Sequence, residues 1–216
     1  DAMFALAHLE LWRLSERGVP APLVLEAFRL LAQTNLALNC GQHQDMLFEG
    51  RSTVSVHEYL EMIAGKSAAL IAASAQMGAV VAGLGPEEAA RYAKFGRDLG
   101  MSFQIRDDIL GIWGNPEVTG KSAATDIVSR KKTLPVLYGL SRSDELAAIY
   151  AQPHQGNAQL ERAVAILDRL EARAFAADYE ARYFERARAF LEALAPGSPP
   201  VAALCDLVRG LIGRGA

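Results

Sequence analysis

Cysteine is scarce in this sequence: 216 residues contain only Cys40 and Cys205. Two distant cysteines do not form the dense, regularly spaced pattern of a small secreted domain that is stabilised by disulfides. The first residues are apolar and lack the basic segment that opens a secretory signal. We therefore expect a protein of the reducing cytoplasm.

Charge of one sign is also scarce, since the formal net charge is only −3. Such a balance gives no reason to expect nucleic acid or an anionic membrane surface as a partner. An anionic substrate would then have to be bound by a local cluster of cations. With 51% hydrophobic and 22% charged residues, the chain can bury a sizeable core.

Long apolar runs are missing as well. The longest, 68–84, is rich in Ala and Gly and contains Ser74 and Gln76. It is short for a membrane span, so we expect a closely packed bundle helix and no transmembrane segment.

Strand-like alternation, internal repeats and low-complexity tracts are absent, and helical periodicity dominates. A capping box at Ser55 and Glu58 marks one helix start, and Pro86 after Gly85 marks another. We expect a single all-α domain over 1–216. Its predicted helices are 1–14, 20–48, 55–83, 86–113, 134–140, 144–151, 157–176, 178–194 and 200–213.

Polar residues stand out in the segment 100–113, which is otherwise apolar on almost every side and reads as a buried helix. Gln104, Asp107, Asp108 and Gly111 fall at i, i+3, i+4 and i+7, on one side of that helix. Two adjacent buried carboxylates are costly unless cations neutralise them. Their oxygen atoms suit a hard cation such as Mg²⁺.

The loop that follows Gly114 supplies positive charge. It carries Lys121, Arg130, Lys131 and Lys132. Mg²⁺ that is held by few carboxylates completes its shell with water and substrate phosphates, and lysines bind the same phosphates as point charges. The stretch predicts a Mg²⁺–diphosphate site in a helical bundle. The alternative is an Asp pair that Arg106 satisfies, beside a solvated lysine loop.

The order F-Q-I-R-D-D-I-L-G, then G-K-x4-D-x4-K-K-T-L-P, resembles the second aspartate-rich region of the trans-isoprenyl diphosphate synthases. This family includes farnesyl and geranylgeranyl diphosphate synthases. The resemblance implies an isoprenoid-synthase-type helical bundle around a central cavity. It also implies Mg²⁺-dependent condensation of an allylic prenyl diphosphate with isopentenyl diphosphate, and a homodimer whose interface lies in 1–48.

The resemblance also implies roles for individual residues. Asp107 would be a Mg²⁺ ligand with Asp108 supporting it at the metal, and Gln104 would hydrogen-bond near the site. Lys66, Gln104 and the two aspartates form the expected catalytic set. The diphosphate-binding residues would be Lys66, Ser67, Gln104, Lys121 and Lys131.

Further polar residues fit the family pattern less specifically. Lys131 is preferred to Lys132 because it lies five residues after Asp126 and four before Pro135. Asp126 is expected to orient the lysine loop. Gln42 and Asp45 match a Gln-x-x-Asp that faces the cavity in the family.

Part of the family pattern is absent. Asp107-Asp108 is the only Asp-Asp pair, no Arg-Arg pair exists, and Gly111 stands where the family has a third aspartate. We therefore expect an N-terminally truncated synthase that cannot condense prenyl diphosphates alone. Two other readings stay open: a non-catalytic subunit that binds a catalytic partner, and a helical interaction protein.

Overall fold

The structure is a computed structural model that describes residues 2–115, 124–152, 156–194 and 199–212. Its longer helices are α1 (Ala2–Glu16), α2 (Ala21–Gly50), α3 (Val56–Ile63), α4 (Ala69–Val81), α5 (Pro86–Trp113), α10 (Asn157–Arg169), α11 (Ala172–Ala193) and α12 (Pro199–Ile212). Shorter elements are the π-helical turn η1 (Ala64–Ala68), α7 (Thr125–Val128), α8 (Leu134–Leu140) and α9 (Asp144–Tyr150). Within these ranges there is no strand, and the predicted all-α bundle is confirmed.

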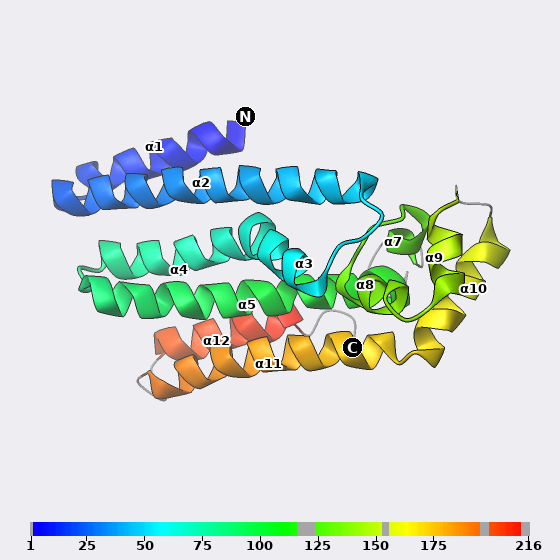
Figure 1. Ribbon diagram of the computed structural model, residues 1–216. Coiled ribbons are helices and arrows are strands. Elements are labelled where there is room, and N and C mark those ends of the chain that lie inside the picture. Colours follow the sequence, from blue (N-terminus) through cyan, green and yellow to red (C-terminus); the bar gives the residue numbers. More distant parts are fainter. Residues whose placement is uncertain (1, 116–123, 153–155, 195–198, 213–216) are drawn as a thin grey trace.

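Helix α5 is the central element of the bundle. It packs against α4 on one side and against α11 on the other, while α2 lies across α4 and η1. Figure 1 shows α1 and α2 at one side, α11 and α12 at the opposite side, and α7 to α10 gathered at one end. The polar residues near the end of α5 therefore lie where the long helices meet the short ones.

Two glycines allow α5 to approach the helix formed by η1 and α4 closely. A Cβ atom at Gly96 would lie 2.6 Å from the Ile71 carbonyl oxygen, and one at Gly100 would lie 2.6 Å from the Cα atom of Ala68. At such distances the backbone atoms would have to move, and they cannot move aside as easily as the end of a flexible side chain. Glycine is thus required at both positions for this helix pair.

The core beside the site joins α3, α5, α8 and α11. Its fully buried members include Tyr59, Ile63, Met101, Ile105 and Leu134. The expectation that α5 is buried on every side near its end is only partly correct. The side that carries Gln104, Asp107 and Gly111 is partly exposed, and it forms the floor of the site described below.

The predicted helix starts at Ser55 and Pro86 are confirmed. The Glu58 backbone N–H donates to Ser55 Oγ at 3.1 Å, and the Ser55 N–H donates to Glu58 Oε2 at 2.8 Å. The predicted break near 177 is wrong, because the chain turns at Leu170 and Glu171 instead. Glu171 adopts a left-handed φ of 56°, and no glycine or proline marks that turn in the sequence.

Within the described residues, one helical stretch, Val56–Val81, is long and apolar enough to cross a membrane. This finding rests on length and composition alone, and core helices of soluble proteins meet the same criterion. Here α4, the second part of the stretch, packs against α2 and α5, although only 28% of the apolar window is buried. The absence of a transmembrane segment stays a prediction.

Candidate active site

Asp108 is the most deeply buried polar group of the site, with none of its surface exposed. Its Oδ2 accepts hydrogen bonds from the Tyr59 hydroxyl and, at 3.3 Å, from the Leu134 backbone N–H. Its Oδ1 accepts one from Gln104 Nε2 at 3.1 Å. Burial raises the pKa of Asp108 to about 6, although these donors and Lys131 favour the ionised form. The carboxyl group thereby connects α3, α5 and α8.

The sequence did not identify Tyr59 as a site residue, although its hydroxyl group donates directly to Asp108. It is fully buried, and both burial and the Asp108 charge raise its pKa well above the usual value. Its hydroxyl therefore remains a hydrogen-bond donor at neutral pH. The one feature of the sequence that could have indicated this role is a tyrosine, with its hydroxyl group, on the apolar side of a helix.

Arg106 does not neutralise the aspartate pair. Its Nη1 atom lies 3.4 Å from Glu180 Oε2 on α11, on another side of α5. The alternative in which Arg106 satisfies the two aspartates therefore disagrees with the structure. Asp108 is held by neutral donors from α3, α5 and α8 instead.

The π-helical turn η1 presents Lys66 and Ser67 to the site. Lys66 Nζ forms an ion pair with Asp45 Oδ2 of α2. Ser67 Oγ donates to Gln104 Oε1 at 2.5 Å, which links η1 through Gln104 to Asp108. Single π-helical turns are frequent at functional sites because they change the direction of side chains within a helix.

The backbone of α2 lies directly against η1 at Gly41. A Cβ atom there would lie 2.9 Å from both the Gly65 carbonyl carbon and the Lys66 Cα atom. Gly41 therefore permits the close approach that brings Asp45, one helical turn further along α2, to Lys66. Gln42 is exposed at the next position on α2.

Lys131 faces a group of carboxylates. Burial by itself lowers the pKa of Lys131, but nearby negative charges outweigh this effect and raise it. In order of effect they belong to Asp126, Asp108, Asp107 and Asp45. Since Asp45 also pairs with Lys66, its carboxylate lies near both predicted diphosphate-binding lysines.

Asp126 and Lys131 are also joined through the backbone. The Lys131 N–H donates to the Asp126 carbonyl at 2.9 Å, and the Arg130 N–H donates to the Ile127 carbonyl at 3.1 Å. With Arg130 at a left-handed φ of 58°, this is a Schellman turn that ends α7. The turn directs the chain back so that Lys131 lies near the Asp126 side chain.

The side chain of Asp126 covers Gly111. A Cβ atom at Gly111 would lie 2.7 Å from the Asp126 carboxyl carbon. The space that a third aspartate would need is thus already filled by a carboxylate from α7. The sequence could not reveal this contact, because the two residues are joined by a loop.

The resemblance implies a bound magnesium ion, so we ask whether the side chains of the site can bind one. In the described ranges, no group of three or more His, Cys, Asp or Glu side chains is placed to hold a metal ion. Asp107 is partly exposed and can offer carboxylate oxygens, and Mg²⁺ accepts one or two carboxylates when phosphates and water complete its shell. Direct contact with Asp108 conflicts with its complete burial and its three donors, so Asp108 supports the site from below.

The structure thus brings together most of the predicted site residues. The exposed side of α5 near its end is surrounded by two lysines, three aspartates and two neutral polar residues, with Asp108 beneath. They are Lys66, Lys131, Asp45, Asp107, Asp126, Ser67 and Gln104. Lys121 lies outside the described residues. Such an arrangement, with cations and oxygen donors side by side, can bind a diphosphate together with a divalent metal.

Comparisons with known proteins show the family of this chain. The sequence profile of the family described as Polyprenyl synthetase matches residues 1–167. A geranylgeranyl diphosphate synthase from Mycobacterium tuberculosis is 42% identical over 172 residues, which are 77% of this chain and 48% of that protein. The chain therefore spans about half the length of this curated relative.

Solved structures are similar over nearly the whole chain. A polyprenyl synthetase from Streptomyces coelicolor A3(2) has a TM-score of 0.82 at 32% identity, covering 96% of this chain and 64% of that one. A polyprenyl synthase from Caulobacter crescentus CB15, solved with calcium and isoprenyl diphosphate, has a TM-score of 0.79 at 30% identity, with 88% and 60% covered. The profile match alone spans more than half of the sequence, and this chain therefore belongs to the polyprenyl synthetase family.

Proposed function

We propose that this chain forms the allylic-diphosphate side of a prenyltransferase active site. The enzyme condenses an allylic prenyl diphosphate with isopentenyl diphosphate to give a longer trans-prenyl diphosphate, geranylgeranyl or farnesyl diphosphate. The observation that carries the proposal is the joint placement of Lys66, Lys131 and Asp107 around the exposed side of α5. Family membership supports the reaction class.

In this proposal the side chains bind and orient the diphosphate and do not attack it. Lys66 and Lys131, with Lys121 by resemblance, neutralise the diphosphate, and Ser67 adds a hydroxyl. Asp107 would hold Mg²⁺, which when bound offsets the negative charge that grows on the leaving diphosphate. Gln104 is kept in place by Ser67 and Asp108. The Caulobacter crescentus polyprenyl synthase was solved with calcium and isoprenyl diphosphate, which supports the use of a divalent ion in this proposal.

The bond changes follow from this arrangement. The allylic C–O bond breaks and the diphosphate leaves with the electron pair. The double bond of isopentenyl diphosphate then attacks the allylic carbon, and loss of a proton restores a double bond in the product. Apolar surroundings exclude water, which would otherwise trap the carbocation.

Asp107→Asn in the longest natural form of the protein tests this proposal. Condensation of radiolabelled isopentenyl diphosphate with farnesyl diphosphate should fall at least about a hundredfold, because the variant loses a charged metal ligand. Asp178→Asn is the matched control, since Asp178 is an exposed carboxylate on α11 that pairs with Arg182 at 2.8 Å. Equal turnover in wild type and both variants would contradict the proposal.

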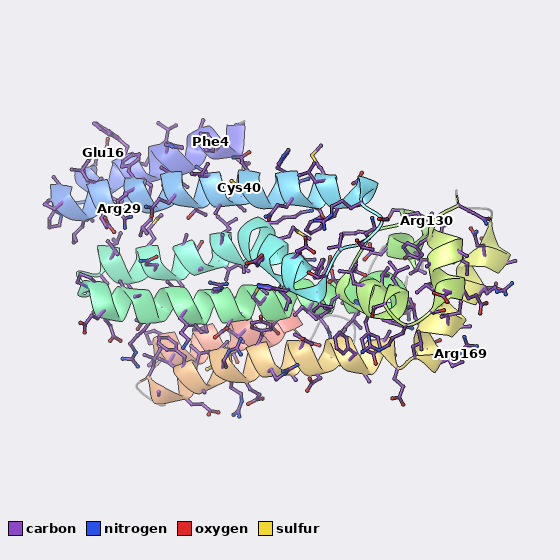
Figure 2. All side chains as sticks on the ribbon, in the orientation of Figure 1. Phe4, Glu16, Arg29, Cys40, Arg130 and Arg169 are labelled. Atoms are coloured by element: carbon purple, nitrogen blue, oxygen red, sulfur yellow. The ribbon has the colours of Figure 1, made fainter. Side chains whose placement is uncertain are left out.

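We also propose that the protein acts as a cytoplasmic homodimer whose interface lies in 1–48. Helix α1 exposes a series of large apolar side chains: Met3, Phe4, Leu6, Leu9 and Trp12. Figure 2 shows that α1, where Phe4 is labelled, lies at the outer side of the bundle with side chains directed away from α2. Trp12 is 62% exposed, so Trp12→Arg should weaken self-association, as measured by light scattering over a concentration series. A monomeric wild type would contradict the dimer.

A further inference from the structure

Two adjacent lysines of the loop, Lys131 and Lys132, have opposite surroundings. Lys131 faces the carboxylates of the site. Burial and the nearby charge of Arg51 lower the pKa of Lys132, although Glu49 acts in the other direction. In the sequence, Lys132 is one of the loop cations but is not expected to bind the diphosphate.

The ammonium group of Lys132 donates to the end of α2. Its acceptors are the backbone carbonyl oxygens of Phe48 and Arg51 and, at 3.4 Å, that of Glu49. An ammonium group has three N–H donors, so these carbonyls use all of them. Lys132 is therefore not available for a substrate phosphate while this contact lasts.

The end of α2 needs such a donor. The last carbonyls of a helix have no partner within it, and a cation there is favoured by the helix dipole. The last turn of α2 contains no basic residue of its own, and the first residue beyond it, Arg51, pairs with Glu58 at 2.7 Å. Lys132, 84 residues after Phe48, supplies the missing charge.

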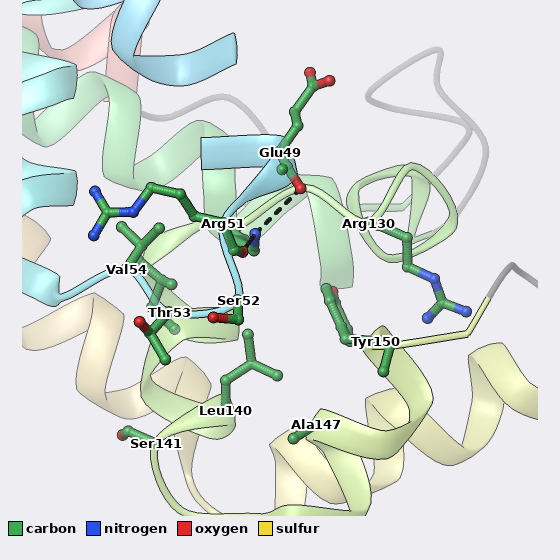
Figure 3. A pocket seen from close by; sticks show the side chains of 14 residues that line it. Glu49, Arg51, Ser52, Thr53, Val54, Arg130, Leu140, Ser141, Ala147 and Tyr150 are labelled. Carbon is green, nitrogen blue, oxygen red and sulfur yellow. Dashed lines mark hydrogen bonds between the residues drawn. The ribbon is translucent and has the colours of Figure 1, made fainter. Parts of the chain in front are cut away.

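Lys132 stands between two cavities. One, of about 150 Å³, is lined by Asp45 and Lys131 on the side of the site, and Lys132 also lines it. The other, of about 710 Å³, lies beyond Lys132 and is lined by Thr53, Leu140 and Tyr150 among others. Figure 3 looks into this larger cavity, and its dashed line ends at the Glu49 carbonyl. The Lys132 contact thus forms a wall of the site.

We propose that Lys132 is a positioning residue that ties the lysine loop to the C-terminus of α2 and thereby holds Lys131 opposite Asp45. This inference rests on the proposed function for its effect on substrate binding. The contact itself is a property of the folded chain. The two lysines thus have different roles: Lys131 binds the substrate diphosphate, and Lys132 holds the loop in position.

Hydrogen exchange of the purified chain tests the contact without any activity. Lys132→Met keeps the aliphatic stem and removes the ammonium group, so amides at 48–51 and 130–133 should exchange roughly tenfold faster. Lys132→Arg should restore slow exchange, and Lys94→Met, at an exposed position on α5, should leave these amides unchanged. Unchanged exchange in Lys132→Met would overturn the proposal.

Steady-state kinetics of the longest natural form test the positioning role. Lys132→Met should raise the KM for farnesyl diphosphate about tenfold with a smaller effect on kcat, and Lys132→Arg should recover most of the loss. Faster exchange with an unchanged KM would show that Lys132 only stabilises α2 and would overturn the role. A wild type without product would count against the proposed function, whereas the exchange experiment would still decide the contact.

Discussion

At the scale of single residues, neighbours in the sequence have contrasting tasks. Asp108 is enclosed by Tyr59, Gln104 and Leu134, whereas Asp107 is partly exposed. Successive helical residues point about 100° apart, so one member of an Asp-Asp pair is directed to the core and the other to the site. The sequence predicted the pair, but it could not say which carboxyl would be buried.

The buried carboxyl of Asp108 predicts a specific pH dependence of stability. Its pKa rises from 3.8 to about 6 on folding, so between these values the folded state holds a proton that the unfolded chain has released. The free energy of unfolding should therefore decrease as the pH rises from about 4 to about 6, by up to roughly 3 kcal/mol. Urea unfolding of wild type and Asp108→Asn from pH 4 to 7 measures this difference. Parallel curves for the two proteins would contradict the assignment.

The contact of Gly111 with Asp126 is a second test at this scale. Gly111→Ala should stabilise the protein by less than the roughly 1 kcal/mol that alanine usually adds within a helix, because the Asp126 carboxyl group, whose carbon would lie 2.7 Å from the new Cβ, has to move aside. In an Asp126→Ala background the same change should stabilise the protein, since alanine favours helix. Thermal unfolding of the four proteins measures the coupling. Equal stabilisation in the two backgrounds would show that Asp126 does not cover Gly111.

At the scale of elements, the parts of the fold with local signals were predicted and the others were not. Ser55 and Pro86 start helices through their own side chains, and both starts are confirmed. The turn at Glu171 has no glycine or proline to mark it. The π-helical turn η1 contains Gly65, but this glycine lies against α2 and could not be told from an ordinary helical glycine in the sequence. The lysine loop was predicted from its motif, but the α7 turn that shapes it was not.

The close packing of α5 against η1 at Gly100 can be tested by substitution. Gly100→Ala should lower the free energy of unfolding by about 1–3 kcal/mol, because the added carbon meets the backbone of Ala68. Gly78→Ala in α4 is the matched control: no atom lies within 4 Å of its Cβ position, so this change should stabilise the protein by up to about 1 kcal/mol. Differential scanning calorimetry distinguishes them. An equal shift of the two melting temperatures would refute the close packing.

At the scale of the whole molecule, the described residues place three partly exposed aspartates, Asp45, Asp107 and Asp126, near two lysines, but they hold no group of three or more side chains placed to bind a metal ion. We therefore predict that the purified 216-residue chain, given Mg²⁺, farnesyl diphosphate and isopentenyl diphosphate, forms no elongated product. Radiochromatography of the extracted lipids measures this. An elongated prenyl product above the enzyme-free blank would contradict the prediction.

We propose above that this chain carries a Mg²⁺-dependent site for an allylic diphosphate. Isothermal titration of farnesyl diphosphate into the 216-residue chain, with and without Mg²⁺, measures such binding without any need for turnover. We predict binding that strengthens with Mg²⁺ and weakens at least about tenfold in Lys131→Met, because one charge-assisted contact to the diphosphate is lost. Lys94→Met, far from the site on α5, should bind as wild type does. Binding that is indifferent to both Mg²⁺ and Lys131, or no binding at all, would contradict the claim.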